Sequence, residues 1–234
     1  MSVGLSTQVG YSEIIRYLRS QSRTGRRTKR VSQSTGNVDI DRQLDRAIKI
    51  AAQILEVNPA FTFYDPDRFL GENETWGMNA FAKPVNIFPG TRGLVGFGLA
   101  RFRTELFGYD QTGTTVMCIV AHEFGHVVQA DLGYLAQIVD RGAPKWHEIN
   151  ADFLAGYYLG VRKIAVPQLQ FEKAEEVFSR LGKANAGNPN RTHGDSEERV
   201  KAARGGYAAG YIDRLSLPDA VRRGWQYIGY RPQG

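Results

Sequence analysis

Residues 114–132, which read TTVMCIVAHEFGHVVQADL, decide the fold. This stretch is long enough for about five helical turns, and small or apolar residues occupy most of its positions. Gly133 follows it, and glycine commonly ends helices. The sequence therefore predicts one long, buried helix near the middle of the chain.

Two histidines on this helix, His122 and His126, are four residues apart, and Glu123 directly follows the first. Residues four apart lie on one helix face, so both imidazoles can reach a single metal ion. Glu123 lies about 100° around the helix, where its carboxylate can act as a general base on a water at that ion. In a chain with four histidines, His-Glu-x-x-His arises by chance roughly 0.003 times. The motif predicts one catalytic Zn²⁺ per chain.

A catalytic zinc needs a third protein ligand and an open fourth position. Glu148 is the candidate third ligand on the next predicted helix, with His147 as its competitor. Asp152, one turn after Glu148, can accept a hydrogen bond from the outer nitrogen of a ligand histidine and fix its tautomer. The plainer alternative is a solvated acidic pair. Cys118 is expected in the core, because a fourth protein ligand would close the catalytic position.

These motifs resemble those of the gluzincin peptidases. His122-Glu-x-x-His126 followed by Glu148-x-x-Ala151-Asp152 is similar to the pattern of the family that contains HtpX and the CAAX prenyl protease, and bacterial putative neutral zinc metallopeptidases share much of it. Weaker similarities support the match over about residues 60–204. They are Asn79-Ala80-Phe81-Ala82, residues 87–94, and Thr192-His193-Gly194 with Arg199 further on.

The resemblance implies an α+β, zincin-like fold, with the active-site helix under a small mixed or antiparallel sheet and further helices towards the C-terminus. It implies zinc held by His122, His126 and Glu148, and peptide hydrolysis with Glu123 as the base. It also gives expected roles to weaker matches: an oxyanion donor (His193), a residue that holds its loop (Arg199), and an edge strand that pairs with substrate backbone (Asn79, Ala80, Phe81).

Each weaker match also has a plain structural reading, as a loop histidine, an exposed arginine and an ordinary strand. We expect a hydrolase, a zinc metalloendopeptidase acting on protein or peptide substrates. The alternatives are a dedicated regulatory metalloprotease and a non-catalytic zinc-binding scaffold, each with a single partner. The intact Glu123 argues against the scaffold, because a structural zinc site has no use for a general base.

The remaining pattern predicts the other elements. A helix is expected from Asp39 or Asp41 to Leu55, a strand at residues 61–64, one or two short strands within 80–88, and helices at 147–161, 171–181 and from Asp195 or Ser196 to Ala203. The apolar, glycine-rich run at 93–99 is expected to open a helix that continues to Phe107.

The chain has 234 residues, of which 42% are hydrophobic and 23% charged, as in ordinary globular proteins. We expect a zincin-like domain over 39–204, a flexible basic segment over 1–38, and an aromatic, glycine-rich tail over 205–234 packed on the domain. The basic residues between Arg16 and Arg30 can contact an anionic partner. They lack the interleaved aromatic residues of a single-strand binder, so nucleic acid is not favoured.

The sequence contains no apolar run of the roughly 18 residues that a membrane span needs, and no apolar core of a signal peptide follows its basic residues. Cys118 is the one cysteine, which fits a reducing compartment. These features predict a protein of the cytoplasm without a membrane span.

Overall fold

The computed structural model describes residues 31–32, 34–64, 80–99, 113–134, 145–183 and 193–229. Asn79 and the basic residues between Arg16 and Arg30 lie outside these ranges. The described part is a mixed α+β structure in which helix predominates, so the predicted class is confirmed. Its elements are β1 (Val31–Ser32), α2 (Val38–Ile54), β2 (Ala60–Tyr64), β3 (Ala80–Lys83), β4 (Leu94–Gly98), α5 (Thr114–Asp131), α7 (Lys145–Ala165), α8 (Phe171–Lys183), α9 (Ser196–Tyr207), the π-helix η3 (Ala208–Ile212) and α10 (Leu217–Tyr227).

The four strands form one mixed sheet in the order β1-β2-β4-β3. β2 runs parallel to β4, with Ala60 opposite Leu94, whereas β1 and β3 are antiparallel to their neighbours. β3 is therefore an edge strand among the described residues. The strands expected at 61–64 and within 80–88 are confirmed by β2 and β3.

The helix expected from residue 93 is wrong, because residues 94–98 form strand β4. All five of its residues are buried, and a strand covered on both faces shows no alternation that would distinguish it from a buried helix. Gly96 lies opposite Phe81 in the register. A Cβ at Gly96 would lie 2.5 Å from two carbons of the Phe81 ring, so the ring occupies the space that a side chain would need.

The N-cap of helix α2 lies two positions before the nearer of its expected caps. The Asn37 side chain accepts hydrogen bonds from the backbone N–H groups of Asp39 (3.0 Å) and Ile40 (3.2 Å), so Asn37 is the N-cap instead of Asp39 or Asp41. The Asp41 carboxylate accepts from the backbone N–H and the hydroxyl of Thr35, both at 2.7 Å. It thereby ties the preceding segment to the first turn of α2.

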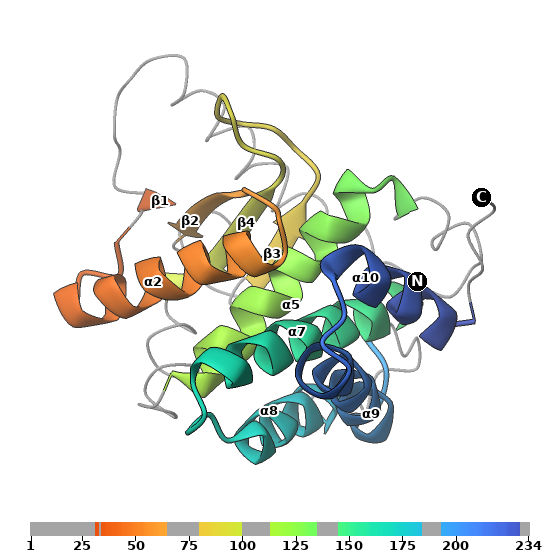
Figure 1. Ribbon diagram of the computed structural model, residues 1–234. Coiled ribbons are helices and arrows are strands. Elements are labelled where there is room, and N and C mark those ends of the chain that lie inside the picture. Colours follow the sequence, from red (N-terminus) through yellow and green to blue (C-terminus); the bar gives the residue numbers. More distant parts are fainter. Residues whose placement is uncertain are drawn as a thin grey trace.

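Helix α5 lies in the middle of the molecule, with the sheet and α2 on one side and α7, α8, α9 and α10 on the other (Figure 1). Large aromatic side chains from each layer meet in one core: Phe63, Phe97, Phe124, Phe153 and Trp225. Because α5 is buried on nearly every face, polar side chains on it are held in fixed surroundings.

The backbones of α7 and α9 are in direct contact. A Cβ at Gly156 would lie 2.0 Å from the carbonyl oxygen of Ala203, and one at Gly206 would lie 1.8 Å from that of Phe153. Only glycine fits at these positions. The two helices therefore approach closely enough for side chains of α9 to contact residues midway along α7. None of the helices in the described ranges is both long and apolar enough to cross a membrane.

Candidate metal centre

Two helices position the candidate ligands. His122 and His126 project from α5, and Glu148 projects from the first turn of α7. The helices cross where Gly125 faces Ala151, and a Cβ at Gly125 would lie only 3.2 Å from the Cα of Ala151. This close crossing brings the carboxylate of Glu148 against the histidine pair.

Short distances join the side-chain donor atoms of these three residues in pairs. The His122 Nε2 and His126 Nε2 atoms are 3.2 Å apart. One oxygen of Glu148 lies 3.3 Å from His122 Nε2, and the other lies 3.4 Å from His126 Nε2. Ligands about 2.0–2.1 Å from a tetrahedral zinc lie about 3.3 Å from one another. The group is largely buried and could hold a metal ion.

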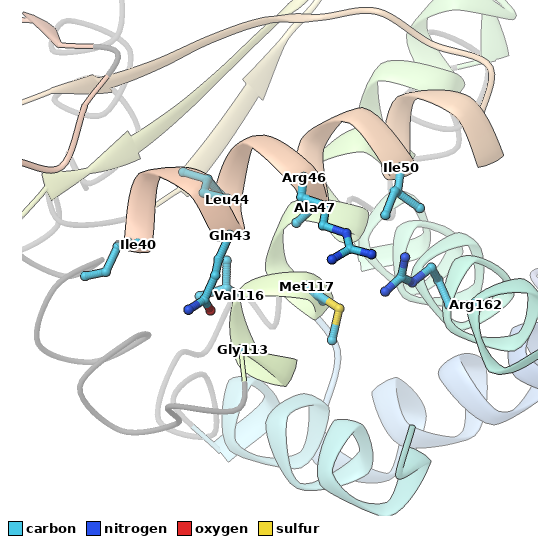
Figure 2. Close-up of a pocket in the computed structure, with 10 residues that line it drawn as sticks. All are labelled: Ile40, Gln43, Leu44, Arg46, Ala47, Ile50, Gly113, Val116, Met117 and Arg162. Atoms are coloured by element: carbon cyan, nitrogen blue, oxygen red, sulfur yellow. The ribbon is translucent and has the colours of Figure 1, made fainter. Parts of the chain in front are cut away.

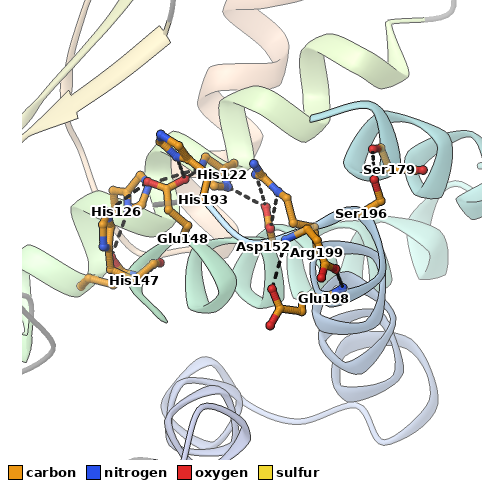
Figure 3. A network of polar contacts seen from close by, with 12 residues as sticks. His122, His126, His147, Glu148, Asp152, Ser179, His193, Ser196, Glu198 and Arg199 are labelled. Atoms are coloured by element: carbon orange, nitrogen blue, oxygen red, sulfur yellow. Dashed lines mark hydrogen bonds and ion pairs between the residues drawn. The ribbon is translucent and has the colours of Figure 1, made fainter. Parts of the chain in front are cut away.

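The outer nitrogen of His122 is held by a buried carboxylate. His122 Nδ1 lies 2.8 Å from an oxygen of Asp152, which is completely buried. Arg199 of α9, also buried, donates from Nε and Nη2 to the two oxygens of Asp152, each at 2.8 Å (Figure 3). Because both oxygens of Asp152 accept from Arg199, we assign the hydrogen bond with His122 to donation from Nδ1, and Nε2 of His122 faces His126 and Glu148.

His126 has a corresponding partner that the sequence analysis missed. Its Nδ1 lies 3.0 Å from the Gln129 side-chain oxygen. The Gln129 amide nitrogen in turn donates to the backbone oxygen of His147 at 2.7 Å and to the side chain of Asn150 at 3.0 Å. Gln129 is completely buried. Its polarity within an otherwise apolar stretch, three residues after His126, was the signal that could have identified it.

Two more histidines surround Glu148. His147 Nε2 lies 3.0 Å from one of its oxygens, and His193 Nδ1 lies 3.0 Å from the other. His147 therefore contacts the carboxylate of Glu148. The group that could hold a metal ion contains Glu148 and not its competitor His147. The His193 side chain is 44% exposed, so it can also be reached by a ligand from solvent. Cys118 is buried in the core and is not part of the group.

The electrostatics of the site favour a bound cation. Burial by itself would raise the pKa of Glu148, but His126, His122 and His147 outweigh it and hold that pKa well below its usual range. Burial by itself would lower the pKa of His122, but Asp152 outweighs it and raises the pKa to about 10. The surroundings of His122 thus stabilise positive charge at this ring, whether a proton or a metal ion supplies it.

Glu123 lies beside the group, and its residue is only 7% exposed. Burial raises the pKa of its carboxyl group, and His122 and His126 oppose that shift. A carboxylate with a raised pKa accepts a proton more readily than an ordinary glutamate, as a general base must. Burial lowers the pKa of Lys83, and the charge of Glu123 opposes part of that shift.

Strand β3 packs against α5 and carries the two described residues of the expected substrate strand. Ala80 is half-buried, and the Phe81 ring is buried beside Tyr64, with 5.6 Å between ring centroids. Among the described strands β3 pairs with β4 alone, so the group that it can offer a ligand is its outer backbone edge.

Comparison with models of known families, with curated proteins and with solved structures finds no match to this chain. The resemblance to gluzincin peptidases therefore rests on the motifs themselves. The arrangement of His122, His126, Glu148 and Glu123 carries the argument about function.

Proposed function

We propose that this protein is a zinc-dependent endopeptidase with a zincin-like fold, similar to the gluzincins. The observation that carries the proposal is the cluster of His122, His126 and Glu148, in which the two imidazole Nε2 atoms are 3.2 Å apart and one oxygen of Glu148 lies 3.3 Å from the first and the other 3.4 Å from the second. The buried carboxylate of Glu123 interacts electrostatically with both histidines. Three protein ligands from two histidines and one glutamate, with one position open, are the composition of a catalytic zinc site.

In this proposal His122, His126 and Glu148 hold the metal, while Asp152 and Gln129 fix the orientation of the two imidazoles. When bound, zinc supplies Lewis-acid chemistry, polarising a carbonyl and lowering the pKa of a water to about 7. Glu123 takes the proton of the attacking water at its carboxylate and then delivers it to the leaving amine.

In this proposal His193 assists at the carbonyl oxygen. Its Nδ1 donates to the Glu148 carboxylate, so Nε2 of this partly exposed ring donates to the oxygen of a bound substrate when the ring carries a second proton. The outer edge of β3 would pair with the backbone of an extended peptide, through Ala80, Phe81 and the adjacent Asn79. Such pairing gives affinity with little dependence on the substrate's sequence.

Metal content and activity test the proposal together. We expect about one zinc per chain in the wild type by mass spectrometry and loss of most of it in Glu148→Gln. Glu175→Gln is the matched control, because Glu175 forms an exposed ion pair with Arg204. Glu123→Gln should retain zinc while digestion of unfolded casein falls about 10²–10⁴-fold.

Two results would contradict this proposal. Wild-type protein that stays free of metal after zinc is supplied would exclude the zinc site, and full zinc in Glu148→Gln would remove Glu148 as a ligand. Full zinc combined with intact casein would instead favour a dedicated regulatory protease, or a scaffold, that acts on one partner.

A further inference from the structure

A second site candidate lies between α2, α5 and α7, and none of its lining residues belongs to the metal centre (Figure 2). The pocket and the solvent at its mouth together hold about 500 Å³ of space not filled by protein atoms. Leu44 and Ile50 of α2 and Val116 and Met117 of α5 give it apolar walls.

The charged residues that line this pocket are cationic in the described part of the chain. Arg46 of α2 and Arg162 of α7 line it, and no described aspartate or glutamate does. Figure 2 shows the two guanidinium groups turned towards each other at one end of the pocket. Within the described ranges neither arginine forms an ion pair, and the buried Nε of Arg162 has no hydrogen-bond partner. A buried donor without a partner is uncommon in folded proteins and calls for an explanation.

No described aspartate or glutamate lies within ion-pair distance of either guanidinium group. Tyr158, which interacts electrostatically with Arg162, is neutral near pH 7, because burial raises the pKa of its phenol to about 12 against the opposing effect of Arg162. Two facing guanidinium groups repel each other, and an anion between them would convert that repulsion into attraction. A carboxylate suits them best in a narrow pocket, because guanidinium groups bind it through paired, charge-assisted hydrogen bonds.

We propose that this pocket binds an apolar chain that ends in a carboxylate, with the carboxylate between Arg46 and Arg162 and the chain against Leu44, Val116 and Met117. A fatty acid and the C-terminus of an apolar peptide both have this chemistry. The proposal does not depend on the function of the metal centre.

Titration calorimetry on the zinc-loaded full chain tests it, with decanoate below its micellar concentration as the probe. We expect one decanoate per chain, at least tenfold weaker binding in Arg46→Gln and in Arg162→Gln, and unchanged zinc content. Arg42→Gln is the control on the same helix, since Arg42 is exposed and paired with Asp39, and decanoate binding should not change there. Because Arg46 is solvent-exposed, its replacement leaves the core intact.

Comparison ligands separate the two parts of the recognition. Decanol should bind at least tenfold more weakly than decanoate, and acetate should not bind measurably. The proposal would be overturned if decanol bound as tightly as decanoate and neither Arg46→Gln nor Arg162→Gln weakened binding. It would also be overturned if acetate or inorganic phosphate bound as tightly as decanoate. N-acetyl-dileucine and its amide show whether the natural ligand is a peptide C-terminus or a fatty acid. If it is a peptide C-terminus, N-acetyl-dileucine should bind more tightly than decanoate, and its amide, which lacks the carboxylate, should bind more weakly. If it is a fatty acid, decanoate should bind more tightly than N-acetyl-dileucine.

Discussion

Asp152 of α7 joins three helices through a single buried carboxylate. It accepts hydrogen bonds from His122 of α5 and from two nitrogens of Arg199 of α9, all at 2.8 Å. The carboxylate and the guanidinium are both removed from water, so each depends on the other for its charge to be tolerated.

Asp152→Asn should therefore lower the free energy of unfolding by more than the loss of an exposed charge does. We expect the free energy of unfolding to fall by about 3–5 kcal/mol, because Arg199 keeps a buried charge without its partner. Zinc affinity should fall by about 10–100-fold, since His122 loses the group that orients it. Urea unfolding and competition with a chelator measure the two effects.

The matched control is Asp219→Asn, which removes the exposed partner of Arg222. Exposed pairs contribute up to about 1 kcal/mol, so this variant should unfold almost as the wild type does. An equal, small loss of unfolding free energy in both variants would show that Asp152 does not stabilise the buried charge of Arg199.

Gln129 gives a second prediction about orientation. Gln129→Met has a similar volume but cannot accept from His126 or donate to α7. We expect zinc affinity to fall by about 10–100-fold with the ligands themselves intact. Gln226→Met, at an exposed position of α10, should leave zinc affinity unchanged in the same chelator competition. Wild-type affinity in Gln129→Met would show that His126 is held by packing alone.

The candidate ligands could be predicted from the sequence. The spacing of His122 and His126 is a local property of one helix, and Glu148 is a candidate from its donor type and from the resemblance to the gluzincin motifs, with His147 as its competitor. Gln129 could not be assigned a task in the same way, because one of its partners is the backbone oxygen of His147, whose position depends on how α7 crosses α5. The expected role of Asn79 stays a prediction, since that residue lies outside the described ranges.

The contact between α7 and α9 can be tested with two neighbouring glycines. Gly206→Ala places a methyl group 1.8 Å from the backbone oxygen of Phe153, so the helices must separate. We expect a loss of about 1–3 kcal/mol in the free energy of unfolding. Gly205→Ala meets a ring carbon of Phe153 at 3.3 Å and gains helix propensity, so its stability should change by less than about 1 kcal/mol. Urea unfolding measures the free energy of unfolding of both variants. Equal losses of stability in the two would contradict the close backbone contact between α7 and α9.

The elements differ in how far the sequence predicted them. The amphipathic helices and the strand β2 have periodicities that identify them without tertiary information. β4 was assigned wrongly because its five residues are all buried, and because Gly96 is explained only by the ring of Phe81 on the adjacent strand. Burial on both faces is a property of the assembled sheet, which a single apolar run does not reveal.

The candidate metal centre lies where the layers of the molecule join. α5 supplies two ligands, α7 supplies the third, and α9 reaches the site through the pair of Arg199 with Asp152. A cation at this point would offset the charge of Glu148 and add a further link between α5 and α7, which already meet through packing and through the hydrogen bonds of Asp152 and Gln129. Metal binding is therefore expected to stabilise the whole fold as well as to serve the chemistry.

Removing the metal should lower the melting temperature of the protein. A ligand that binds only the folded state at 100 times its dissociation constant adds about 2.7 kcal/mol of stability. For a chain of this size that corresponds to about 5–10 °C, at roughly 2–4 °C per kcal/mol. Calorimetry should show this fall on dialysis against a chelator, and recovery with zinc but not with magnesium, which prefers oxygen ligands. Glu148→Gln, which lacks one ligand, should melt at nearly the same temperature with and without zinc. A zinc response in Glu148→Gln as large as that of the wild type would place the stabilising ion elsewhere in the protein.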